Sequence, residues 1–112
     1  MKHLIIVLIV QIVLTASAVA AGNAQAGKEK SATCVACHGE NGISATPMFP
    51  NIAGQYADYI YHALNSYKDG GRNNAIMVGI ATALSDQDMK DLAAYYSSME
   101  GLRPFGLPEK SN

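Results

Sequence analysis

The stretch that decides the fold of this 112-residue chain is Cys34-Val35-Ala36-Cys37-His38. It places two thiols three positions apart and an imidazole directly after the second thiol. Thiols at this spacing can reach the two vinyl groups on one side of a porphyrin and form thioethers, and the next His can then ligate the iron axially. The pattern C-x-x-C-H is typical of c-type haem attachment. We therefore expect one haem c with its iron, attached through Cys34 and Cys37 and ligated by His38.

Two other uses of the cysteines stay open. A redox-active C-x-x-C disulfide belongs near a βαβ pattern, and the sequence has no convincing strand pattern. A zinc site would have to draw on Cys34, Cys37, His38 and His62, the Cys and His residues that follow the N-terminal apolar segment. Adjacent Cys37 and His38 would struggle to serve one tetrahedral ion. His62 stands in the middle of an expected helix, and we expect it at the surface or the edge of the core.

Residues 1–20 are expected to be a separate segment. A short basic start is followed by an apolar run over Leu4–Leu14 and then by small residues. This order is typical of a secretory signal peptide, and Ala18-Val19-Ala20 fits its cleavage pattern. An uncleaved membrane anchor is the alternative, but a spanning helix needs about 20 strongly apolar residues. We expect cleavage after Ala20 and a periplasmic location, with membrane contact only if the leader is kept.

The composition after the leader excludes some functions. Of the eight Lys and Arg side chains, Lys2 belongs to the leader. The remaining chain has seven basic and nine acidic side chains, so its net charge is mildly negative. No basic cluster is present that could neutralise phosphates, so we expect no nucleic-acid partner. A mature chain of about 90 residues buries only a modest core, and a large apolar cofactor would relieve that problem.

Helical periodicity appears in three places. Ala24 to Thr33 is expected to be a short helix leading into the cysteines, because Ala26, Lys28, Glu29 and Lys30 are compatible helix formers. From Gln55 to Lys68, apolar residues recur on one helical face until Gly70 and Gly71 end the pattern. Ser85 is a good N-cap, with Asp88 three residues on as in a capping box. A face at helical spacing follows it, made of Met89, Leu92, Ala93, Tyr96 and Met99.

The remaining segments read as loops. Cys34–Asn51 and Arg72–Leu84 carry the breakers, and the second has at most a helical turn near Met77. Gly101–Asn112, with two Gly and two Pro, is expected to be an irregular tail. The sequence thus predicts an all-α domain over residues 21–100, with three to five helices joined by long loops that wrap a cofactor.

Four methionines after the haem motif are candidates for the second axial ligand. Met89 and Met99 lie at core spacing on the last expected helix and are interpreted as packing residues. Met48 follows His38 by only ten residues, so its loop would have to cross the ring edge quickly. Met77 follows His38 by 39 residues and has a whole helix in which to reach the opposite face. This favours Met77 and leaves Met48 or an open iron as alternatives.

From Gly27 to about Met99, the sequence resembles class I c-type cytochromes, in particular small bacterial periplasmic ones, and looks like one half of a tandem dihaem cytochrome. The resemblance rests on six stretches: Cys34–Gly39, Asn41-Gly42, Pro47–Tyr56, Ile76–Gly79, Leu84–Asp88 and Asp91–Tyr95.

The resemblance implies a fold in which three to five helices surround one covalent haem. It also implies that the axial Met is the one just ahead of the Leu-Ser-Asp-x-Asp helix start, which is Met77. A Pro carbonyl about a dozen residues after the haem His, here that of Pro50, would hold the ring of His38. The first and last helices would cross at Gly27, packed by Tyr95.

The function that follows is single-electron transfer rather than an enzymatic bond change, with redox proteins as partners that the sequence does not name. Docking is expected at the exposed haem edge, near Val35, Ala36 and the Ile43–Phe49 loop. Arg72, with Asn73 and Asn74 beside it, is a candidate donor to a haem propionate. Two alternatives are a haem c subunit of a dehydrogenase or oxidase complex and, with an open iron, a ligand-binding or peroxidase-like protein.

Overall fold

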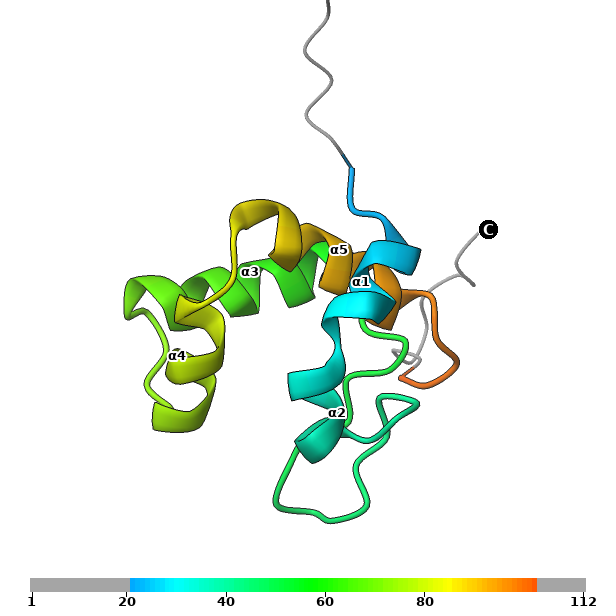
Figure 1. Cartoon of the computed structure of the whole chain (residues 1–112). Helices are drawn as coiled ribbons and strands as arrows, with labels where there is room; N and C mark the ends of the chain where they lie inside the picture. The colour runs from blue at the N-terminus through cyan, green and yellow to red at the C-terminus, as the bar shows by residue number, and fades with distance from the viewer. Residues whose placement is uncertain (1–20, 103–112) are drawn as a thin grey trace, which may run out of the picture.

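The structure is a computed structural model that describes residues 21–102 (Figure 1). The expected leader, residues 1–20, and most of the expected tail, from residue 103 on, lie outside the described residues. The described part contains five helices and no strand, which confirms the all-α fold. The helices are α1 (Ala24–Lys30), α2 (Ala32–His38), α3 (Ala57–Asp69), α4 (Ala75–Thr82) and α5 (Asp86–Ser97).

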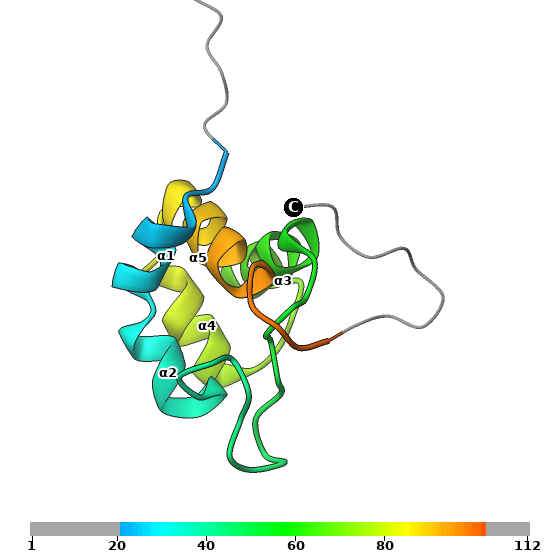
Figure 2. The same ribbon diagram turned by 90° about the vertical axis from the view of Figure 1, so that its right-hand side faces the viewer.

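The first and last helices cross in close contact. A Cβ atom added at Gly27 would lie 2.1 Å from the carbonyl oxygen of Asp91 and 2.7 Å from Cβ of Tyr95. No side chain larger than hydrogen fits there unless the helices separate. Figures 1 and 2 show α1 against α5 in both views. The expected crossing of Gly27 and Tyr95 is therefore confirmed.

A polar cluster joins the same two helices. The ammonium of Lys30 lies 2.8 Å from the carboxylate of Asp88 and 2.7 Å from that of Asp91. Asp91 is buried and also accepts hydrogen bonds from the backbone N–H of Asn23 and the side-chain amide of Gln87. The hydrogen bonds from Lys30, followed by those from the backbone, lower the pKa values of Asp88 and Asp91 to about 2. The cluster therefore stabilises the crossing through charge.

Helix α5 begins where the sequence indicates. The Ser85 hydroxyl accepts from the backbone N–H of Asp88, and the Asp88 carboxylate accepts from the backbone N–H of Ser85, which completes the capping box. The helix ends at Ser97, before the expected end at Gly101. Its buried face packs against α3 in a core made of Ile60, Leu64, Met89, Leu92, Ala93 and Tyr96.

Two expected loops are partly helical: the prediction of a loop from Cys34 on was wrong as far as His38, whereas the helical turn expected near Met77 is a longer helix. The haem motif lies on α2, which ends at His38, and Arg72–Leu84 contains α4. Helix α2 is only seven residues long, too short for a periodic pattern to show. Helix α4 reads Ala-Ile-Met-Val-Gly-Ile-Ala-Thr and is apolar on almost every side, so it lacks the alternation that reveals an amphipathic helix.

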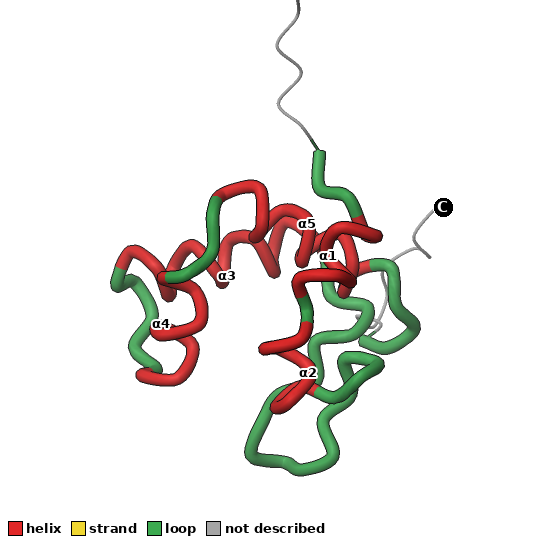
Figure 3. Tube along the Cα trace, in the orientation of Figure 1, coloured by secondary structure: helices red, strands yellow, loops and turns green. Residues whose placement is uncertain are grey.

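Helices α2 and α4 lie on the same side of the α3–α5 pair (Figures 1 and 3). Figures 1 and 3 show α4 at one end of α3 and α2 below α1, with the long loop 39–56 joining α2 to α3. Among the described residues, no helix is long and apolar enough to cross a membrane.

Candidate functional site

A cavity of about 520 Å³ lies between α2, the loop before α3, α3, α4 and α5. Its volume is in the usual range for cofactor and ligand sites. Most of its wall is apolar, with side chains from three helices. These are Ile60, Ala63 and Leu64 of α3, Ile76, Met77 and Ile80 of α4, and Leu92 and Tyr96 of α5.

The haem motif presents its three reactive side chains to this cavity. Cys34, Cys37 and His38 all line it, and the two thiols are not joined to each other. Positions three and four residues apart share one face of a helix, so the helical conformation of α2 itself brings the three side chains together. Burial raises the pKa of the Cys34 thiol, which keeps it protonated until it reacts.

The ring of His38 is held by the loop that precedes α3. Its Nδ1 lies 2.7 Å from the carbonyl oxygen of Pro50 in the loop before α3. A carbonyl only accepts, so Nδ1 carries the hydrogen and Nε2 keeps its lone pair free for a metal. His38 itself is buried, with 8% of its surface exposed.

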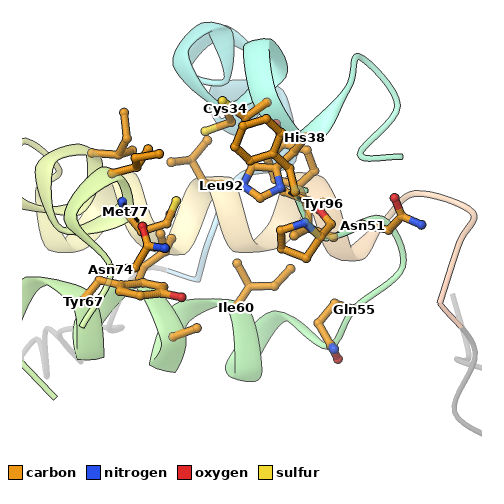
Figure 4. Close-up of a pocket in the computed structure, with 18 of the residues that line it drawn as sticks. Cys34, His38, Asn51, Gln55, Ile60, Tyr67, Asn74, Met77, Leu92 and Tyr96 are labelled. Atoms are coloured by element: carbon orange, nitrogen blue, oxygen red, sulfur yellow. Dashed lines mark hydrogen bonds between the residues drawn. The ribbon is translucent and has the colours of Figure 1, made fainter. Parts of the chain in front are cut away.

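Met77 lies on the α4 wall, apart from His38 on the α2 wall (Figure 4). Its backbone N–H donates to the side-chain oxygen of Asn74, the N-cap of α4, at 3.0 Å. Met48 also lines the cavity, but its side chain is 79% exposed on a loop. Met89 is buried in the core and Met99 packs against that core, in agreement with their expected packing role.

Arg72 lies at the rim between two tyrosines. Its guanidinium donates to the hydroxyl of Tyr59 at 2.9 Å and to that of Tyr67 at 3.5 Å, and it stands over both rings. Arg72 and Asn74 line the cavity, while Asn73 does not. The tyrosines therefore fix the direction of a permanent positive charge at the cavity mouth.

Several lining residues were not predicted as site residues, and Tyr96 is one of them. Tyr96 was expected only in the core or at its rim, yet this buried side chain also faces the cavity beside Cys34 (Figure 4). The available signal was its place four residues after Leu92 on the apolar face of the last helix. His62 is exposed on α3 and lies away from the cavity, as expected.

The walls fit a large, flat apolar cofactor better than a bare metal ion. Three large hydrophobic side chains that are more than 45% exposed, Met48, Tyr59 and Ile76, all line the cavity, where such a cofactor would cover them. Within residues 21–102, no group of three or more His, Cys, Asp and Glu side chains is placed to hold a metal ion. The zinc interpretation therefore lacks a ligand set in this part of the chain.

Comparison with known proteins agrees with this site. The family model described as cytochrome c matches residues 24–100. Cytochrome c-554(548) of Halomonas halodenitrificans is 49% identical over 83 residues, which are 71% of this chain and all of that protein. Cytochrome c4 of Pseudomonas aeruginosa is 45% identical over 100 residues, 89% of this chain and 50% of that protein.

The solved structures lead to the same family. The crystal structure of reduced recombinant cytochrome c4 from Pseudomonas stutzeri aligns with a TM-score of 0.70 at 44% identity, over 73% of this chain and 48% of that one. The chain thus spans about half the length of the cytochrome c4 relatives it matches. The chain belongs to the cytochrome c family. It carries one haem c with its iron, attached covalently through Cys34 and Cys37, and it is an electron-transfer protein.

Proposed function

We propose that this chain is a periplasmic single-electron carrier in which His38 and Met77 are the two axial ligands. One observation carries the proposal: a His with its Nδ1 bound to the Pro50 carbonyl and a Met on a different helix line the same apolar cavity. When bound, the haem supplies an iron that takes up and releases one electron.

The side chains of the site would hold the haem in place and shield it from water. The Pro50 carbonyl fixes the ring of His38 and increases the basicity of its Nε2. A thioether from Met77 favours a higher reduction potential than a second His would. The apolar walls limit water access, and this also governs the potential. Arg72, held by Tyr59 and Tyr67, would donate to a propionate at the cavity mouth.

We also propose that the leader is removed after Ala20. The residues just beyond this point are part of the fold. A Cβ added at Gly22 would lie 2.0 Å from the carbonyl oxygen of Lys90, and the backbone N–H of Asn23 donates to Asp91 at 2.8 Å. Cleavage after Asn23 would remove these contacts. Mass spectrometry of the exported protein should give a chain that begins at Ala21.

Redox partners are proposed to dock transiently near Val35, Ala36 and the Ile43–Phe49 loop. The segment from Asn41 to Ala57 has no charged side chain, and Ile43 is 46% exposed on it. An uncharged contact is little affected by salt, and transient redox encounters are small. A permanent subunit of a dehydrogenase or oxidase complex would instead co-purify with its partner.

Optical spectra of the exported haem protein, oxidised and reduced, would test the ligand assignment in wild type, Met77→Ala and the matched control Met48→Ala. We expect a low-spin wild type with a weak far-red iron–sulfur band. That band should be lost in Met77→Ala and kept in Met48→Ala.

Each other outcome has a definite meaning. Loss of the band in Met48→Ala alone would transfer the ligand role to Met48. A wild type that is already high-spin would show an open iron and favour ligand binding. Haem that is removed by denaturing extraction would contradict attachment through Cys34 and Cys37.

A further inference from the structure

Tyr96 places a buried polar atom on the part of the cavity wall that α5 forms together with Leu92. The residue is 1% exposed and stands on α5 beside Leu92, with its side chain at the cavity next to Cys34 (Figure 4). Its hydroxyl oxygen is buried and has no hydrogen-bond partner of ordinary geometry among the described residues. A Phe would fill the same space without this polar atom.

An unpartnered buried hydroxyl is costly, because the group loses its hydrogen bonds to water and gains none in the protein. Buried tyrosine hydroxyls accordingly tend to find a partner. Burial raises the pKa of Tyr96, so the phenol stays protonated and is available as a donor.

Two polar side chains lie close enough to the Tyr96 hydroxyl to affect its pKa, those of Cys34 and Ser31, and Cys34 lines the cavity together with Tyr96. Ser31 already donates its own hydrogen to the carbonyl of Lys28 at 2.8 Å. A free thiol at Cys34 can donate as well as accept. Once Cys34 forms its thioether to the haem, it has no hydrogen left and its sulfur can only accept.

We propose that Tyr96 donates a hydrogen bond to the thioether sulfur of Cys34 and thereby raises the reduction potential of the haem. Donation to the sulfur draws electron density away from the haem through the carbon that joins them and so favours the electron-rich, reduced state. Hydrogen bonds from surrounding groups are one of the ways by which a protein adjusts a haem potential. Tyr96 is then a positioning residue for electron transfer, and this role rests on the attachment of haem at Cys34.

The test uses the exported haem protein and the variant Tyr96→Phe, with Tyr95→Phe as the matched control. The ring of Tyr95 is 5.1 Å from that of Tyr96 between centroids, but Tyr95 does not line the cavity. We expect a lower midpoint potential in Tyr96→Phe and an unchanged one in Tyr95→Phe. An equal potential in Tyr96→Phe and wild type would overturn the proposal.

A second measurement uses the wild-type protein, so its result does not depend on whether a variant folds. In resonance Raman spectra of wild type, the carbon–sulfur stretch should shift when the protein is transferred to deuterium oxide, because a deuteron then replaces the donated proton. An absent shift would overturn the proposal. If Ser31→Ala lowers the potential as much as Tyr96→Phe, the hydroxyl donates to Ser31 and the proposal is wrong. Failure of haem attachment itself would appear separately, as haem released by denaturing extraction.

Discussion

The two ends of the molecule are built in different ways. At the crossing of α1 and α5, backbones touch at Gly27 and a buried Asp91 is bound by Lys30 and Asn23. At the other end, α4 packs chiefly on α3 and buries one residue, Ala81. The α1–α5 crossing is therefore held together by contacts within the chain itself.

Helix α4 presents its apolar side chains to the cavity instead. It carries no charge, yet Ile76 is 58% exposed, and Ile76, Met77 and Ile80 all line the cavity. An apolar helix is normally buried. The contrast indicates that the haem completes the surroundings of α4, whereas α1 and α5 need no cofactor to pack together.

The largest expected effect comes from removing the haem. The double variant Cys34→Ala/Cys37→Ala should export without covalent haem and lose its cooperative thermal unfolding, because its core is built around the ring. Hydrogen exchange should show residual protection in α1 and α5 and none in α4. Cooperative unfolding of the haem-free chain, or equal protection in all helices, would contradict the proposed difference between α4 and the α1–α5 crossing.

A pair of glycine substitutions compares the two ends directly. Gly27→Ala forces a methyl group into the Asp91 carbonyl and should cost about 1–3 kcal/mol of unfolding free energy. Gly79→Ala in α4 meets nothing within 4 Å and should stabilise by about 0.5–1 kcal/mol through helix propensity. Denaturant unfolding of both haem proteins measures the difference. Equal effects would show that the α1–α5 crossing is not tighter than α4.

Acid should weaken the α1–α5 end first. Asp88 and Asp91 have folded pKa values of about 2, below the ordinary 3.8, so their contribution is present above pH 4 and is lost as pH falls toward 2. Lys30→Gln should flatten this pH dependence of the unfolding free energy, while Lys28→Gln on the exposed side of α1 should leave it unchanged. A Lys30→Gln deficit of the same size at pH 7 and pH 2 would rule out the ionic explanation.

The smallest effects should come from the helix caps. Ser85→Ala removes half of the α5 capping box and should cost about 1 kcal/mol. Asn74→Ala removes the α4 cap, which binds the backbone N–H of Met77. We expect Asn74→Ala to lose a similar amount of stability. The iron–sulfur band should weaken in Asn74→Ala but not in Ser85→Ala. A band that weakens in Ser85→Ala as well would mean that the Met77 ligand depends on global stability and not on its own cap.

Prediction from sequence succeeded where the determinants are local. The capping box of Ser85 and Asp88 and the apolar face that follows were readable because their members are within one or two turns of each other. Helix α2 was missed and helix α4 was expected only as a turn, because seven or eight residues carry little periodic signal, and their conformation depends on neighbours distant in the sequence. The site role of Tyr96 was missed for the same reason, since nothing in its local sequence shows that Cys34 lies beside it.

The sequence by itself determined the cofactor, its attachment and the fold class, because the motif Cys34–His38 carries that chemistry within five consecutive residues. The resemblance of the sequence to class I c-type cytochromes already implied the Pro50 carbonyl at His38 and the choice of Met77. Only the tertiary structure decided the apolar wall that α4 forms around Met77 and the place of Tyr96 beside Cys34 (Figure 4). These pairings join residues from separate elements, and their distances are set by how the helices pack rather than by spacing along the chain.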